Sequence, residues 1–247
     1  MIILYTFGSK FNQPDPSPFV MKAEVLLKMS QLPYETKSTL DTRKAPKGKF
    51  PYIVDREQTI GDSSFIRFYL EDTYQIDFDR DCNRIDLASA FLAEKYCEDH
   101  LYFLSLANRW LVQDNFNKGP KALFQDIPWI MRSQITKKVV KNFEQTLWLQ
   151  GLGRHSIAER CRLVDRGSKM LATVLEDKDF FGGKQPCGSD ASIFASLVGI
   201  LNDFFECPYR QYFIRHDNLV AYVERMVEKY YPAYQNRYTT SDLKSDL

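Results

Sequence analysis

The chain has 247 residues, and its 33 Lys and Arg against 32 Asp and Glu give a formal net charge of +1. Basic and acidic residues are balanced on both sides of residue 80, 11 and 11 before it and 22 and 21 after it, which argues against an extended nucleic-acid-binding face. Hydrophobic residues at 44% and aromatic residues at 14% are typical of a packed core and exclude global disorder.

The first 75 residues are predicted to form short elements joined by turns, since six of the eleven prolines lie before residue 52. Short β-branched and aromatic runs indicate strands, and hydroxyl or carboxylate side chains ahead of apolar periodic segments indicate helix starts. In chain order the predictions are a strand at 2–5, a helix from Ser17, a strand at 34–36, an antiparallel hairpin of 52–54 and 59–60, and a helix at 62–70.

The first helix has clear start signals. Ser17 is a favourable N-cap, and Pro18 is favourable at the first helical position. Lys22, Glu24 and Lys28 are predicted to point outward, with Glu24 and Lys28 spaced for an i,i+4 ion pair. The helix is predicted to bury the apolar side chains Phe19, Ala23, Leu26 and Leu27.

Beyond residue 84 the pattern is helical, because residues 62–118 contain no proline or glycine and residues 129–185 contain no proline. Apolar residues spaced by three or four predict one buried seam, formed by Ala90, Ala93, Cys97, Leu101 and Leu104. Further helices are predicted at 122–149, 156–176, 189–205 and 218–230. The polar residues Thr239 to Leu247 are predicted to be frayed.

Five cysteines and three histidines are spread through the chain, and no two cysteines have a C-x-x-C spacing. A zinc site built from local pairs is therefore not expected, and a reducing, cytoplasmic location fits the unpaired thiols best. The N-terminus has no basic segment ahead of a long apolar stretch, so no secretory signal is expected. The longest apolar segment, 193–200, is interrupted by Ser196 and is far shorter than the ~20 residues of a membrane span.

Three local features combine polar groups with positions that suit a small ligand. Ser17 places a hydroxyl at a helix N-terminus, where free N–H groups and the helix dipole attract a thiolate or another anion. The alternative is that Ser17 only caps its helix. Pro51 at the start of a strand marks an edge, a bend or a cis peptide bond. Asp62 suits an ammonium group and Ser63 suits a carboxylate, although any capped helix looks like this.

These features resemble, in their order, the thioredoxin-like N-terminal domain of cytosolic glutathione transferases, and the helical remainder resembles their C-terminal domain. The motifs that carry a more specific resemblance, to the failed-axon-connections and metaxin-related branch, are Ser17-Pro-Phe, Leu32-Pro-Tyr-Glu35, Pro46-Lys-Gly-Lys-Phe-Pro51 and Gly151-Leu-Gly-Arg-His-Ser156. The expected architecture is an α/β thioredoxin-like N-terminal domain at 1–75, an all-α C-terminal domain at 84–232 and a polar tail at 233–247.

The resemblance implies a role for each candidate residue. Ser17 takes the place of the hydroxyl or cysteine that contacts the glutathione sulfur. Phe50, preceding a cis Pro51, would pair its backbone with the cysteinyl part of the tripeptide, and Asp62 and Ser63 would hold its γ-glutamyl end. The basic loop would meet the glycyl carboxylate, or is simply solvated; its members are Arg43, Lys44, Lys47 and Lys49, of which Lys49 is assigned to the site.

The sequence also departs from the family pattern. Val20 stands where some relatives have a second thiol, and Ser17 is not a cysteine, so thiol–disulfide exchange is disfavoured. The loop from Gly8 to Pro16 is longer than in many transferases, which leaves Tyr5 and Thr6 as alternative hydroxyls for the glutathione sulfur.

The predicted function is a glutathione transferase that conjugates the glutathione thiolate to an unidentified electrophile, with glutathione as co-substrate. One alternative is a non-catalytic binding or adaptor protein of the same fold, and another is a glutathione-dependent thiol oxidoreductase. The resemblance also implies a homodimer with a role in detoxification. The unpaired thiols and the balanced charge predict a cytoplasmic protein without a nucleic-acid partner.

Overall fold

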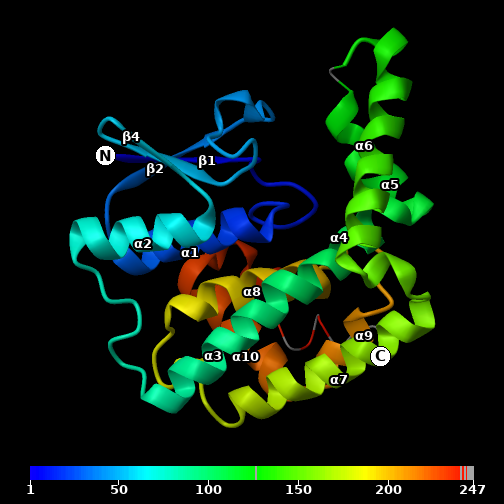
Figure 1. Cartoon of the computed structure of the whole chain (residues 1–247). Coiled ribbons are helices and arrows are strands. Elements are labelled where there is room, and N and C mark those ends of the chain that lie inside the picture. Colours follow the sequence, from blue (N-terminus) through cyan, green and yellow to red (C-terminus); the bar gives the residue numbers. More distant parts are fainter. Residues whose placement is uncertain (126, 240, 242, 244–247) are drawn as a thin grey trace.

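A small sheet with two helices against it precedes a larger group of helices (Figure 1). The computed structural model describes residues 1–125, 127–239, 241 and 243. Its first part comprises β1 (Ile2–Thr6), α1 (Pro18–Ser30), β2 (Tyr34–Ser38), β3 (Tyr52–Asp55), β4 (Gln58–Gly61) and α2 (Ser63–Tyr74). This is the order of elements that the sequence predicts, and the thioredoxin-like prediction for this part is confirmed.

The four strands are ordered β2-β1-β3-β4, with β1 parallel to β2 and antiparallel to β3. The hairpin of β3 and β4 turns at residues 56–57, where Arg56 has a φ of +54°. Tyr52 pairs with Tyr5 on one side and with Gly61 on the other. The end of β1, the start of β3 and the end of β4 therefore meet at one end of the sheet, and this places the three predicted features near one another.

Helix α1 lies between the sheet and the helical part of the chain, which changes one prediction. Lys22 was expected to point to solvent, but it is only 1% exposed. Because α1 also packs against α2 and α8, it has no solvated face at this turn. The predicted Glu24–Lys28 ion pair is confirmed, with 3.4 Å between Lys28 Nζ and Glu24 Oε1.

The second part is all helical. It comprises α3 (Arg84–Tyr96), a π-helical turn (Cys97–Leu101), α4 (Tyr102–Leu111), α5 (Gln113–Lys118), α6 (Trp129–Gln150), α7 (Ile157–Leu175), α8 (Gly188–Leu201), α9 (Arg210–Ile214) and α10 (Asp217–Tyr230). Every residue of the predicted seam from Ala90 to Leu104 is buried. Every residue of α8 except Gly199 is buried, so this helix forms the centre of the core.

Two predicted helices have different bounds in the structure. The helix predicted at 122–149 begins at Trp129, and a short 3₁₀ helix (Pro120–Phe124) comes before it. Pro128 explains the break, because proline lacks a backbone N–H and disfavours helical backbone at the residue before it. The helix predicted at 189–205 ends at Leu201, where Asn202 turns away with a ψ of 128°.

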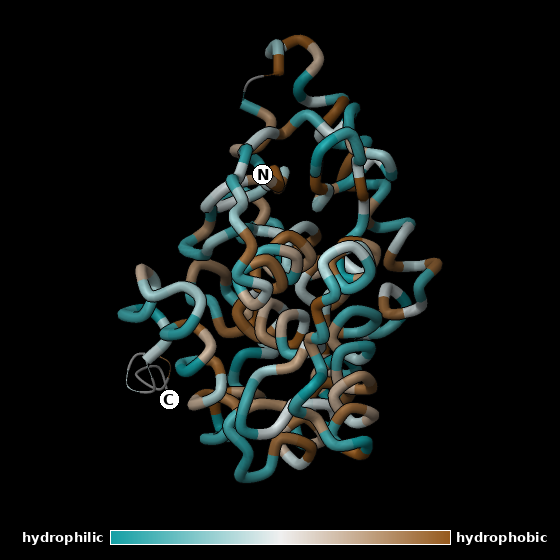
Figure 2. Tube along the Cα trace, turned by 90° about the vertical axis from the view of Figure 1, so that its left-hand side faces the viewer, coloured by the Kyte–Doolittle hydropathy of each residue, from teal (hydrophilic) through white to brown (hydrophobic). Residues whose placement is uncertain are grey.

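The C-terminal segment continues as a 3₁₀ helix (Pro232–Arg237). Tyr238 and Leu243, in the region predicted as a polar tail, are each 2% exposed and belong to the core cluster. Of the residues predicted to be frayed, 240, 242 and 244–247 lie outside the described residues. Figure 2 shows hydrophobic turns running through the middle of the molecule. Within the described residues, no helix is both long enough and apolar enough to cross a membrane.

Candidate functional site

Ser17 precedes the first turn of α1, as the sequence predicts. Ser17 Oγ accepts a hydrogen bond from the N–H of Val20 at 3.4 Å, so the N-cap prediction is confirmed. Among the described residues this is the one hydrogen bond found for the Ser17 hydroxyl, which leaves its proton available to a ligand. A thiolate at this position would face the positive end of a 13-residue helix.

Asp15 fixes the loop before Ser17, and sequence reasoning missed it. Asp15 Oδ1 accepts the N–H of Ser17 at 2.8 Å, and Oδ2 accepts those of Phe7 and Gly8 at 2.9 and 3.0 Å. Burial raises the pKa of Asp15 from 3.8 to about 7, although the three N–H groups act in the opposite direction. A carboxylate two residues before an N-cap is the sequence signal that could have identified it.

Helix α4 of the helical part contacts the same loop. The Arg109 guanidinium donates a hydrogen bond to the carbonyl oxygen of Pro16 at 2.6 Å. The ring of Tyr102 lies edge-on to Phe19, with 4.9 Å between the ring centroids. Pro16 and Phe19 are on either side of Ser17 in the chain, so α4 lies next to the candidate hydroxyl.

The second predicted feature lies against the first turn of α1. The Phe50–Pro51 peptide bond is cis, as predicted. Phe50 is buried in one apolar cluster with Val20, Ala45 and Tyr52. Because Val20 belongs to the turn that Ser17 caps, this cluster holds the backbone around Pro51 close to the start of α1.

The third predicted feature begins α2. Asp62 Oδ1 accepts the N–H of Ser64 at 2.9 Å, and the Asp62 N–H donates to the carbonyl oxygen of Pro51 at 3.1 Å. Ser63 is buried, whereas the Asp62 side chain is 44% exposed. Lys47 Nζ lies 3.8 Å from Asp62 Oδ2. The basic loop therefore contacts the helix start through Lys47, while the assigned Lys49 is exposed on the same loop.

A buried ionic cluster connects α1 and α2 to the helical part. Lys22 Nζ donates to Ser64 Oγ at 3.3 Å, to Glu94 Oε1 at 2.8 Å and to Glu98 Oε1 at 2.6 Å. The hydroxyl of Ser189 on α8 donates to Glu94 at 2.7 Å. Each charge thus has a partner, which buried ions require. The cluster fixes the start of α2 relative to α1.

The alternative hydroxyls, Tyr5 and Thr6, have neighbours of their own. The Tyr5 ring stacks on Tyr52 with 4.2 Å between centroids. Thr6 Oγ1 lies 3.2 Å from Ser38 Oγ, within hydrogen-bonding distance. Thr6 and Ser38 are among the residues that line a cavity at the edge of the sheet.

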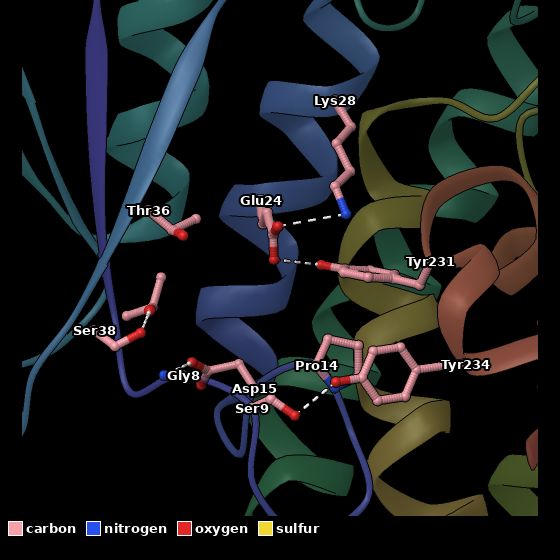
Figure 3. A pocket seen from close by; sticks show the side chains of 11 residues that line it. Gly8, Ser9, Pro14, Asp15, Glu24, Lys28, Thr36, Ser38, Tyr231 and Tyr234 are labelled. Atoms are coloured by element: carbon pink, nitrogen blue, oxygen red, sulfur yellow. Dashed lines mark hydrogen bonds and ion pairs between the residues drawn. The ribbon is translucent and has the colours of Figure 1, made fainter.

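That cavity, shown in Figure 3, has a volume of about 240 Å³. It lies between the loop at 8–15, α1 and the C-terminal segment, and its charged residues are Asp15, Glu24 and Lys28. Tyr231 donates a hydrogen bond to Glu24 at 2.9 Å across it. Of the predicted candidates the cavity lining includes the alternative hydroxyl Thr6 but not Ser17, and Asp15 connects the two places because it lines the cavity and also bonds Ser17.

Comparison with known protein families identifies both parts of the chain. The profile described as "Glutathione S-transferase N-terminal domain" matches residues 18–115, and the profile "Glutathione S-transferase, C-terminal domain" matches residues 165–226. The chain belongs to the glutathione S-transferase family. The matched segments include the basic loop, the cis proline and the start of α2.

Two curated proteins are similar to this chain along most or all of its length. An isoprene-epoxide–glutathione S-transferase of Rhodococcus sp. (strain AD45) is 29% identical over 93% of this chain and 99% of its own length. Failed axon connections of Drosophila melanogaster is 27% identical over the whole of this chain, which spans 62% of the length of that relative. The predicted resemblance to both the family and this branch is confirmed.

Solved transferase structures share the fold at low sequence identity. The β-etherase LigF from Sphingobium sp. strain SYK-6 superposes with a TM-score of 0.66 at 18% identity, covering 95% of this chain and 97% of its own. A glutathione S-transferase of Ceriporiopsis subvermispora in complex with glutathione has a TM-score of 0.58 at 17% identity, covering 95% and 97%. These similarities establish the two-part transferase architecture.

Proposed function

We propose that this member of the family is a glutathione transferase, with glutathione as co-substrate and an electrophile of unidentified structure as second substrate. The observation that carries the proposal is the Ser17 hydroxyl at the start of α1, because the turn that it caps packs through Val20 against Phe50 of the cis Phe50–Pro51 bond. The carbonyl oxygen of Pro51 in turn accepts the N–H of Asp62, which caps α2. The name of the Rhodococcus relative and the glutathione complex of the Ceriporiopsis structure support the choice of ligand.

Each part of glutathione has a candidate partner in the proposal. Ser63 and the free N–H groups of α2 would bind the γ-glutamyl carboxylate, and Asp62 its ammonium group. The Phe50 backbone would pair with the cysteinyl part. Lys49, with its neighbour Lys47, would bind the glycyl carboxylate. The protein thus offers, at each end of glutathione, a charge opposite to one that the tripeptide carries there.

Thiolate stabilisation is the chemical task of Ser17 in this proposal. A thiol with a pKa near ~8.5 is only a few per cent ionised at pH 7. Lowering the pKa by about two units requires ~2.7 kcal/mol of preferential stabilisation of the thiolate. A donated hydroxyl proton and one helix N-terminus supply interactions of this size. The thiolate then forms a bond from sulfur to the electrophilic carbon. A bond from that carbon to the leaving or electron-accepting atom breaks, and this atom takes the electron pair of the broken bond.

Substitution of Ser17 by alanine tests the proposal. Ser17→Ala should raise the thiol pKa of bound glutathione, which ultraviolet titration of the complex measures. It should also slow conjugation at neutral pH by roughly tenfold for each unit by which the pKa rises. Glutathione affinity in titration calorimetry should change less, because the γ-glutamyl and backbone contacts remain. If both the pKa and the rate are unchanged, Ser17 is only a helix cap and Tyr5 becomes the next candidate.

A non-catalytic binding protein of the same fold is the second candidate. The observation in its favour is the similarity to Failed axon connections along the whole of this chain. The two candidates differ in turnover. A protein that conjugates glutathione to none of a panel of electrophiles supports the second candidate. The thiol oxidoreductase alternative is disfavoured because Ser17 and Val20 occupy both thiol positions. A homodimer belongs to the proposal on family grounds alone.

A further inference from the structure

Two cysteines and one carboxylate lie together at the junction of the two parts of the chain. Asp79 and Cys82 come from the segment between α2 and α3, and Cys187 comes immediately before α8. Their ligand atoms, one carboxylate oxygen and two sulfurs, all lie within 4.8 Å of one another. Cys187 is buried, while Asp79 and Cys82 are half-buried.

The backbone holds this group in place before any ligand binds. The Cys82 N–H donates to the carbonyl oxygen of Asp79 at 2.9 Å, which closes a turn and brings both side chains to the same side. The N–H of Gly188 donates to Asp79 Oδ1 at 3.0 Å, which fixes the start of α8 against that turn. Two residues separate Asp79 from Cys82, which is the spacing of the paired cysteine ligands in many zinc sites.

We propose that Asp79, Cys82 and Cys187 form a binding site for a soft divalent cation of the Zn²⁺ class, which fastens the segment between α2 and α3 to the start of α8. Two thiolates select such ions over Mg²⁺ and Ca²⁺, which prefer oxygen ligands. Three protein ligands leave a fourth tetrahedral position for water on the half-buried side.

The charges around the two sulfurs favour this ion. The Asp79 carboxylate belongs to the group, and the Asp190 carboxylate is adjacent to it, because Asp190 Oδ2 accepts the N–H of Cys187 at 2.9 Å. Negative charge at these two positions stabilises a divalent cation bound between the sulfurs. The Arg67 guanidinium pairs with Asp79 Oδ2, and each Asp79 oxygen keeps a further lone pair for the ion.

Binding replaces two thiol protons by one cation. The sulfurs of Cys82 and Cys187 each release a proton to the buffer and donate an electron pair to the ion, so one cation should release two protons. No electron transfer and no oxidant is involved. This distinguishes the site from a disulfide between the same cysteines.

Titration with Co²⁺, a spectroscopic probe for Zn²⁺ sites, tests the proposal on the full, reduced chain after removal of metals by a chelator. We expect one Co²⁺ per chain, sulfur-to-cobalt absorption in the near ultraviolet, and two protons released into a weakly buffered solution. Zn²⁺ should displace the Co²⁺ and raise the melting temperature of the protein.

Three variants make the test specific. Cys82→Ser, at a half-buried position, should remove the sulfur-to-cobalt absorption and weaken binding at least tenfold, and Asp79→Asn should weaken binding while keeping the absorption. Cys161→Ser, which changes a half-buried cysteine on α7, is the matched control and should bind Co²⁺ normally. Native protein without sulfur-to-cobalt absorption, or equal losses in Cys82→Ser and Cys161→Ser, would overturn the proposal.

Discussion

Asp15 and Asp190 each hold a loop against the start of a helix through three backbone N–H groups, one beside the candidate site and the other inside the helical core. Asp15 accepts those of Phe7, Gly8 and Ser17, and Asp190 accepts those of Phe181, Gly182 and Cys187, all between 2.8 and 3.1 Å. Both are almost fully buried, 2% and 0% exposed. We call them the Asp15 clamp and the Asp190 clamp.

The surroundings of the two clamps differ. The Asp190 clamp lies under α10, where the Tyr222 hydroxyl donates to the Asp190 carbonyl oxygen at 3.1 Å. The Asp15 clamp borders the cavity of Figure 3 and ends at Ser17, whose hydroxyl is available to a ligand. The same arrangement thus stabilises the fold in one place and positions a candidate catalytic group in the other.

Among substitutions compared at a single pH, Asp190→Asn is expected to have the largest effect on stability. The amide can present its oxygen to some of the three N–H groups but turns its own NH₂ toward the rest, which leaves at least one buried donor unsatisfied. Each such group costs about 1–3 kcal/mol, so the free energy of unfolding should fall by about 3 kcal/mol. Urea denaturation followed by circular dichroism measures this.

Asp177→Asn is the control for that measurement. Asp177 is exposed in the turn that follows α7, and its substitution should change the free energy of unfolding by less than about 0.5 kcal/mol. An Asp190→Asn protein as stable as this control would show that the Asp190 clamp contributes little to the fold.

Local sequence signals predicted the elements that carry the site. Ser17 and Asp62 cap their helices as expected, the hairpin at 52–60 forms, and the Glu24–Lys28 pair is present. Each of these features depends on residues close together in the chain. The local patterns of proline, hydroxyl and charged residues are therefore sufficient to predict these caps, this hairpin and this ion pair.

Burial of polar groups could not be predicted in the same way. Lys22 carries a charge on a helix with an apolar pattern, and its partner Glu94 is 72 residues away in the chain. The position of Asp15 depends on how the loop at 8–16 folds back on Phe7, and Cys187 approaches Cys82 only through tertiary packing. Such pairings follow from the arrangement of layers, which the local pattern of a single segment does not specify.

The clamps should also differ in pH dependence. In the folded protein Asp15 has a pKa of about 7, raised from 3.8, so the folded state holds this proton more tightly than the unfolded state. This group's contribution to stability is complete below about pH 4 and is lost as the pH rises through 7. The full difference is roughly 4 kcal/mol.

Comparison with Asp15→Asn isolates that contribution, because asparagine does not titrate. The free energy of unfolding of the native protein, minus that of Asp15→Asn, should decrease between pH 4 and pH 8 in urea denaturation. A difference that stays constant over this range would mean that the Asp15 carboxyl titrates at its ordinary pH.

The smallest expected effect is the stabilisation of the protein by bound glutathione. It tests whether the Asp15 clamp, unlike the Asp190 clamp, contributes to the candidate site. At a glutathione concentration ten times its Kd, the native protein should gain about 1.4 kcal/mol of stability. If the Asp15 clamp positions Ser17 and the loop around it, Asp15→Asn should weaken glutathione binding about tenfold and reduce that gain to about 0.4 kcal/mol. Asp190→Asn, in conditions where it is folded, should keep most of the gain because its clamp holds Phe181, Gly182 and Cys187, none of which is a candidate site residue. Equal gains in the two variants would contradict a role for Asp15 in the site, even if glutathione binds.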